Sequence, residues 1–145
     1  MIDLGYKLLR PGAHPPAKTR PGDAAFDLRV DESFVLAPGG RRRASTGIAV
    51  AIPDGMAGLV LPRSGLADRH GITLLNTPGL IDPNYRGEVG LIVHNAGSAA
   101  YAVQAGDRVA QLLVVPVAGV GAVAVDELPP TSDDRGEQGF GSSGR

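Results

Sequence analysis

The chain has 145 residues, of which 14 are basic and 15 acidic, so its formal net charge of -1 favours neither a nucleic acid nor a membrane as partner. It contains no cysteine, which excludes disulfides, thiolate catalysis and cysteine-bound metals, and we expect a cytoplasmic protein. The length fits one domain with a proper core.

Short apolar runs rich in branched residues recur along the chain, separated by many of its 21 glycines and 12 prolines. After a first strand within residues 1–10, this pattern predicts strands at 34–36, 47–52, 58–61, 72–75, 89–93, 109–115 and 120–125. Turn clusters about every ten residues favour a sandwich or jelly roll over an up-and-down meander. The fold class is therefore predicted to be all-β.

Two other segments have different patterns. Residues 64–70 are the best helix candidate, with Ser64 available as N-cap and Gly71 as terminator. The arginine run 41–43 follows Pro-Gly-Gly and is expected to be a solvated loop.

From Asp126 onward the chain turns polar. Prolines stiffen residues 129–134, and residues 135–145 contain four glycines and one aromatic residue. Such a segment has too little apolar surface to order by itself, so any order should come from a ligand.

An anion site is suggested by Arg63, Ser64 and Gly65. A guanidinium beside a hydroxyl and backbone donors suits phosphate oxygens, and glycine lets the backbone come close. Gln111 interrupts an apolar strand with an amide that needs a partner, which a phosphate oxygen could provide. By itself the Arg-Ser-Gly stretch could equally be a surface turn that caps a short helix.

A carboxylate for water activation is suggested at Asp82, which Pro83 holds in a turn. Tyr85 follows closely and offers a ring on which a sugar could pack. The plain alternative is that Asp82 only forms a turn.

Five segments spread over residues 24–144 resemble, in order, the motifs of the trimeric dUTP diphosphatase family: AAFDL, PRSGLA, GLIDPNYRGEV, GDRVAQL and RGEQGFGSSG. The resemblance implies a jelly-roll-like β-barrel (β-clip) that forms a homotrimer with a flexible C-terminal tail. It implies a barrel domain over residues 1–128 and a lid segment over residues 129–145.

The same resemblance implies roles for single residues. Arg63, Ser64, Gly65 and Gln111 would hold the triphosphate. Asp82 would orient and deprotonate the attacking water.

For the nucleoside, the resemblance implies that Tyr85 packs against the deoxyribose and leaves no room for a ribose 2′-hydroxyl. Asn76 would contact the base, and the backbone of the following hairpin would read the uracil edge.

Asp27 matches a family aspartate near the metal and phosphates. The cofactor implied is Mg²⁺, held mainly by the triphosphate, with Asp27 as an indirect ligand. The motif departs from the family's usual glycine and tyrosine at Ala25 and Phe26, losing a hydroxyl and some backbone freedom.

In the tail, Arg135 would reach the terminal phosphate and Phe140 would stack on uracil. Ser142 and Ser143, flanked by glycines, would wrap the anion.

The expected reaction is hydrolysis of dUTP, the small-molecule substrate, to dUMP and pyrophosphate in sites shared between subunits. Two alternatives stay open from the sequence. One is a dCTP deaminase-like relative, and the other is a nucleotide-sensing or protein-interaction module that has lost turnover.

Overall fold

A computed structural model describes residues 2–132 of the chain. Ten strands and one short helix lie within these residues. Their bounds are β1 (Gly5–Leu8), β2 (Phe26–Arg29), β3 (Phe34–Leu36), β4 (Arg41–Ala51), β5 (Met56–Pro62), α1 (Ser64–His70), β6 (Ile72–Leu74), β7 (Gly79–Ile81), β8 (Glu88–Asn95), β9 (Tyr101–Val103) and β10 (Arg108–Pro116). The predicted all-β class is confirmed.

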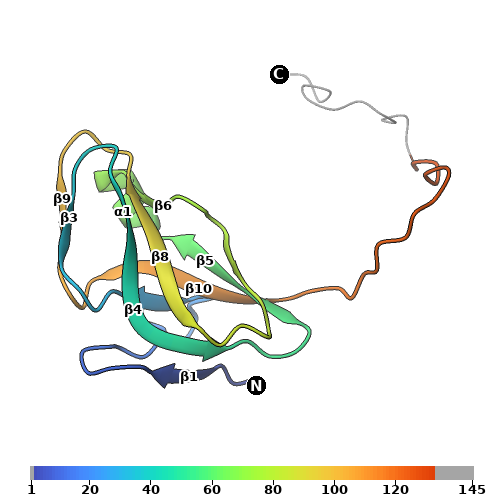
Figure 1. Ribbon diagram of the computed structural model, residues 1–145, viewed down its shortest axis with the longest axis horizontal. Helices are drawn as coiled ribbons and strands as arrows, with labels where there is room; N and C mark the ends of the chain where they lie inside the picture. Colours follow the sequence, from blue (N-terminus) through green and yellow to red (C-terminus); the bar gives the residue numbers. More distant parts are fainter. Residues whose placement is uncertain (1, 133–145) are drawn as a thin grey trace.

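The strands form three antiparallel sheets (Figure 1). One four-stranded sheet has the order β1-β4-β8-β6, a second has the order β2-β10-β5-β7, and β3 pairs with β9. Within residues 2–132 the outer strands of the two large sheets do not pair with each other. The jelly-roll-like barrel therefore stays a prediction.

Alternating side chains of the two large sheets supply the core. On β8, Val89, Leu91 and Val93 point inward, and Leu91 is 1% exposed. Leu28 of β2 and Leu112 of β10 are fully buried in the same cluster. Burying one such side chain contributes about 1.5–3 kcal/mol relative to leaving it exposed.

A buried amide connects the end of β8 to its surroundings. Asn95 Nδ2 donates to the carbonyl oxygens of Leu36 and Ala99, at 3.0 and 2.9 Å, and its Oδ1 accepts from the Gly97 N–H at 2.9 Å. The side chain is 0% exposed, so these bonds offset the cost of burying the amide.

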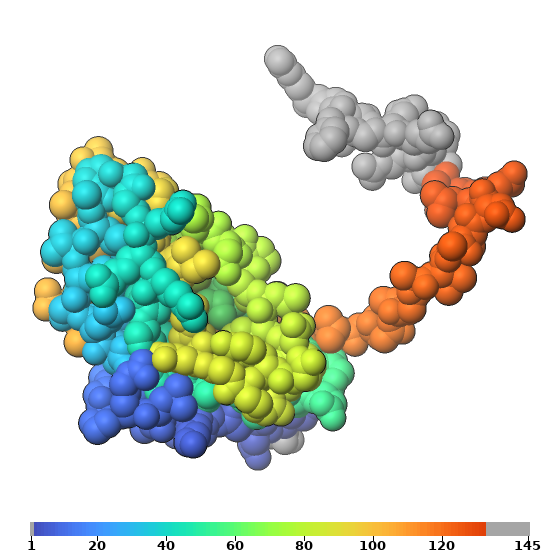
Figure 2. All heavy atoms as spheres, viewed as in Figure 1, coloured from blue at the N-terminus to red at the C-terminus, as the bar shows by residue number. Residues whose placement is uncertain are grey.

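The predicted strand at 120–125 is wrong. Residues 117–132 belong to no strand, and Val120 is 90% exposed. Figures 1 and 2 show this segment running away from the sheets after β10. Valine-rich sequence favours a strand only where a neighbouring strand pairs with it, and the described chain offers none here.

The arginine run 41–43 is not a loop, because it forms the first part of β4 and pairs with β8. Arg42 forms an ion pair with Glu32, Nη2 to Oε2 2.5 Å, and its guanidinium lies 5.1 Å from the centre of the Phe34 ring. Backbone pairing with β8 therefore overrides the polarity of the side chains.

The helix prediction is confirmed in its span but wrong in its cap. Arg63, with φ -94° and ψ 125°, occupies the N-cap position, and no side-chain hydrogen bond caps the helix. Ser64 is the first helical residue and is exposed. Strands β2, β7 and β9 were not predicted from the sequence.

No helix within residues 2–132 has the length and apolar character that a membrane crossing demands.

Gly47 lies at an irregular point of β4. Its φ is +68°, and a Cβ placed on it would lie 2.6 Å from the Ala13 Cβ and 2.7 Å from Asp31 Oδ2. Gly55 has a similar φ of +73° with nothing within 4 Å of such a Cβ. The two glycines share the left-handed backbone and differ only in crowding.

We expect Gly55→Ala to cost about 1–2 kcal/mol of unfolding free energy, the usual penalty of the left-handed region for alanine. Gly47→Ala should cost clearly more, because Ala13 and Asp31 must also move. Urea denaturation of both variants and the wild type measures the difference. Equal losses would show that the close contacts at Gly47 relax without cost.

Candidate active site

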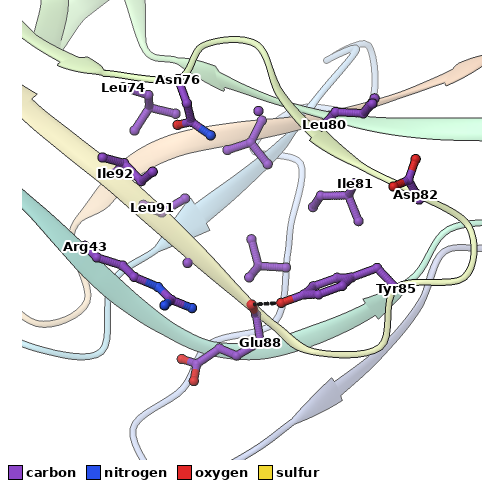
Figure 3. A pocket seen from close by; sticks show the side chains of 14 residues that line it. Arg43, Leu74, Asn76, Leu80, Ile81, Asp82, Tyr85, Glu88, Leu91 and Ile92 are labelled. Atoms are coloured by element: carbon purple, nitrogen blue, oxygen red, sulfur yellow. Dashed lines mark hydrogen bonds between the residues drawn. The ribbon is translucent and has the colours of Figure 1, made fainter.

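The first candidate cavity, the hairpin pocket, has a volume of about 290 Å³ and lies along β7, the following turn and β8 (Figure 3). Asn76, Asp82 and Tyr85 line it together, so the residues predicted for the base, the attacking water and the sugar share one cavity. Apolar side chains from β5, β6 and β8 form much of the remaining wall, including Val60, Leu74 and Leu91. The flat faces of a nucleobase suit such a wall.

Asp82 directly follows β7 and is exposed. Its backbone carbonyl accepts the Tyr85 N–H at 3.1 Å, which closes the turn predicted from Pro83. The carboxylate itself has no hydrogen bond or ion pair in the described part of the chain. Its two oxygens therefore have no competing partner among the described residues.

Tyr85 is held at the edge of the same pocket. The ring is 42% exposed, and its hydroxyl donates to the Glu88 carbonyl at 2.9 Å. Figure 3 shows the ring lying between the turn and the start of β8. The accessible ring offers a surface to a sugar.

The second candidate cavity, the arginine pocket, has a volume of about 630 Å³ and is lined by Arg63, Ser64, Gly65, Asp27 and Gln111 among others. Strand register explains this gathering. Gln111 of β10 pairs with Asp27 of β2 on one side and with Leu61 of β5 on the other. Arg63, Ser64 and Gly65 follow immediately at the end of β5.

Opposite charges are paired in the arginine pocket. Arg63 Nε lies 3.7 Å from Asp27 Oδ1, and Arg108 Nη1 lies 3.3 Å from Asp27 Oδ2. Thr19 Oγ1 also donates to Asp27 at 2.9 Å. Two guanidinium groups therefore surround this carboxylate. With Arg20 and Asp23 included, three arginines and two aspartates line the pocket, and this balance favours an anionic ligand.

The remaining phosphate candidates keep hydrogen-bonding capacity for a ligand. Gln111 Nε2 donates to the Pro62 carbonyl at 2.9 Å, so its amide has a protein partner that the sequence did not indicate. An amide has a second N–H and a carbonyl oxygen besides this donor. Ser64 is exposed and its hydroxyl is not used as a helix cap.

The two pockets lie on opposite sides of β5. Val60 lines the hairpin pocket, whereas its neighbour Leu61 lines the arginine pocket. Successive side chains of a strand point to opposite faces. Within one chain, therefore, the structure brings the predicted phosphate residues together and the predicted nucleoside residues together, but does not join the two groups.

Sequence reasoning missed five charged residues of these pockets. Arg20, Asp23 and Arg108 line the arginine pocket, and Arg43 and Glu88 line the hairpin pocket. Arg108 lies in the GDRVAQL segment next to Gln111, which was the available signal. Glu88 likewise lies in the GLIDPNYRGEV segment, close to Asp82 and Tyr85. Arg43 gave no such signal, because only the pairing of β4 with β8 brings it to the cavity.

The predicted tail residues Arg135, Phe140, Ser142 and Ser143 lie outside the described residues.

Comparison with known proteins identifies the family of the chain that carries these two pockets. The family model described as dUTPase matches residues 12–144. The chain belongs to the dUTPase family. Among its relatives are deoxyuridine 5′-triphosphate nucleotidohydrolases from Tropheryma whipplei (strain Twist) and Anaeromyxobacter sp. (strain Fw109-5). The first is 45% identical, over 98% of this chain and 97% of the relative, and the second is 46% identical, over 99% and 100%.

Solved dUTPases share the fold. The Staphylococcus bacteriophage 80alpha dUTPase with dUPNHPP has a TM-score of 0.91 and 30% identity, and the match covers 100% of both chains. A mutant dUTPase from phage phi11 of S. aureus, described as coordinating a structural Mg(II) ion, has a TM-score of 0.81 and 27% identity, over 87% of this chain and 98% of the other.

Two glutamates that bond to β4, Glu32 and Glu88, have pKa values below the ordinary one. Partial burial works to raise the pKa of Glu88, but hydrogen bonds from Ser45, Gly47 and Arg10 outweigh it and hold the pKa below the ordinary 4.5. A hydrogen bond from Arg42, and a second from the Ser45 N–H, lower the pKa of Glu32 in the same direction.

Both carboxyls bind a proton less readily in the folded chain than in the unfolded chain. Their contribution to stability should therefore be complete above pH 4.5, the ordinary value, and be lost as the pH falls through the lower folded values. Urea denaturation at pH 7 and at pH 4 measures this loss. A Glu32→Gln/Glu88→Gln double variant should lose less stability between the two pH values, and an equal loss would contradict the assignment.

Proposed function

We propose that the chain is a dUTP diphosphatase that hydrolyses dUTP to dUMP and pyrophosphate. The observation that carries this proposal is the division of the family's motif residues into a nucleoside pocket with a free carboxylate and an arginine-lined anion pocket. The family match over residues 12–144 supports the substrate.

The nucleoside end of the substrate is assigned to the hairpin pocket. Asn76 contacts the base, and the Tyr85 ring packs on the deoxyribose. Asp82 orients a water and takes its proton. The water oxygen then bonds to the α-phosphorus, the bond from that phosphorus to its bridging oxygen breaks, and pyrophosphate leaves with the electron pair.

The triphosphate is assigned to the arginine pocket, where Arg63, Ser64, Gly65 and Gln111 donate to its oxygens. Arg108 is added to this set because its guanidinium lines the same cavity. Positioning and charge neutralisation supply most of the acceleration in phosphoryl transfer.

Because the two pockets lie on opposite sides of β5, one nucleotide has to draw on more than one chain. A homotrimer of jelly-roll-like barrels with shared sites meets this requirement. Residues 1–128 form the barrel domain of this proposal, and residues 129–145 form the lid that carries Arg135, Phe140, Ser142 and Ser143 to the nucleotide.

Mg²⁺ is the proposed cofactor. Among the described residues no group of three or more potential ligands gathers, and Asp27 is already near two guanidinium groups. This donor set fits a metal carried mainly by the triphosphate, with Asp27 nearby as an indirect ligand. When bound, Mg²⁺ would neutralise phosphate charge.

The first test replaces the proposed base. Asp82→Asn keeps the shape and loses the proton acceptor, so turnover of dUTP should fall about 10²- to 10⁴-fold while nucleotide affinity changes little. Pyrophosphate release measures turnover, and calorimetry with a non-hydrolysable dUTP analogue measures affinity.

Asp54→Asn is the matched control, because Asp54 is an exposed turn residue that lines neither pocket. Equal turnover in the two variants would remove Asp82 from the mechanism. If the wild type deaminates dCTP and leaves dUTP intact, the deaminase alternative replaces this proposal.

The second test asks whether sites are shared. An Asp82→Asn chain and a chain truncated after residue 134 should each be inactive, one without the base and the other without the lid. Co-expression produces mixed trimers in which the truncated chain's aspartate can meet the variant chain's tail, so activity should reappear. Mixed trimers confirmed by mass that remain inactive would place both elements within one chain.

A further inference from the structure

Strands β4 and β8 pair irregularly where the hairpin pocket begins. Ser45 pairs with Gly90 and Ala49 with Glu88, so β4 has three residues between these pairs and β8 has one. The Glu88 side chain occupies this irregularity. Its Oε1 accepts from Ser45 Oγ at 2.6 Å and from the Gly47 N–H at 2.8 Å. The carboxylate therefore replaces ladder bonds that the extra residues remove.

Arg10 reaches the same carboxylate from the N-terminal segment. Its Nη2 donates to Glu88 Oε1 at 2.5 Å, and its Nε donates to Asp31 Oδ2 at 2.7 Å. Figure 2 shows the N-terminal segment, in blue, against the yellow-green hairpin on this face. Three donors thus converge on one oxygen of Glu88, and charge-assisted bonds of this kind are stronger than neutral ones.

The backbone of Glu88 holds Tyr85. The Tyr85 hydroxyl donates to the Glu88 carbonyl at 2.9 Å, as the dashed line in Figure 3 marks. The ring also lies against Gly87, where an added Cβ would be 2.6 Å from Tyr85 Cζ. Because the ring is 42% exposed, packing alone does not fix it.

From these contacts we infer that Glu88 is a positioning residue that acts through Tyr85 to set discrimination between deoxyribose and ribose nucleotides. The carboxylate fixes the start of β8, and the Glu88 carbonyl fixes the hydroxyl end of the ring. The inference rests on the proposed function for the role of Tyr85 at the sugar.

Glu32 provides a matched control. The side chains of Glu32 and Glu88 are both 29% exposed, and each forms an ion pair with an arginine at 2.5 Å. Glu32 also accepts a hydrogen bond from the Ser45 backbone N–H, whereas Glu88 accepts one from the Ser45 hydroxyl. Unlike Glu88, it does not line the hairpin pocket. A purely structural role would make the two glutamates equivalent.

The kinetic experiment compares Glu88→Gln and Glu32→Gln in the full chain with Mg²⁺, using dUTP and UTP as substrates. In Glu88→Gln the ratio of the two kcat/KM values should fall about tenfold, the loss of roughly one charge-assisted bond, through KM more than kcat. Glu32→Gln should keep the wild-type ratio. Equal ratios in the two variants, with equal melting temperatures, would overturn the inference.

A double-mutant cycle tests whether Glu88 acts through its hydrogen bond with Tyr85. Tyr85→Phe keeps the ring and removes the hydroxyl that bonds to Glu88. If Glu88 acts through this bond, adding Glu88→Gln to Tyr85→Phe should change the dUTP-to-UTP ratio by less than twofold. Additive effects would show that Glu88 influences the substrate by another path.

A third readout does not depend on activity. Fluorotyrosine labelling gives ¹⁹F signals for Tyr6, Tyr85 and Tyr101, and the Tyr85→Phe variant identifies the Tyr85 signal. Glu88→Gln should shift or broaden that signal alone, and Glu32→Gln should leave all signals in place. If the wild type fails to hydrolyse dUTP, the proposed function falls while this measurement still decides whether Glu88 holds Tyr85. An unchanged Tyr85 signal in Glu88→Gln would overturn the positioning role.

Discussion

Strand β10 hydrogen-bonds to both β2 and β5, and the candidate site depends on this double pairing. It places Asp27 and Gln111 side by side although they are far apart in sequence. The same pairing sets which side chains of β5 face outward. Leu61 then lies on the anion side and Val60 on the nucleoside side, so one strand divides the chain's functional residues into two groups.

Ion pairs orient the charged side chains that the strands bring to the arginine pocket. Arg63 and Arg108 share Asp27, whose negative charge offsets the repulsion between the two guanidinium groups and holds both at the wall of the arginine pocket. An anionic triphosphate would find donors already oriented, so little reorganisation is needed on binding. Asp82 differs in that it has no cation partner among the described residues, as the proposed role of proton acceptor requires.

The turn between β7 and β8 is held by distant parts of the chain. Arg10, Ser45 and Gly47 all bond to Glu88, and Tyr85 bonds to the same residue's carbonyl. The position of the Tyr85 hydroxyl therefore depends on the N-terminal segment and β4 as well as on the turn between β7 and β8. Gly47 has to be glycine there because its positive φ and close neighbours leave no space for a side chain.

By itself the sequence determined the all-β class, most of the longer strands, the helix span and the family, because branched residues, turn formers and ordered motifs are local signals. Tertiary structure decided the rest. Pairing with β8 made residues 41–43 a strand, and the absence of a pairing strand in the described chain left valine-rich residues 120–125 extended and exposed. Arg43 joined the hairpin pocket for the same reason. Strand pairing is a contact between distant segments, and no local pattern specifies which segments will meet.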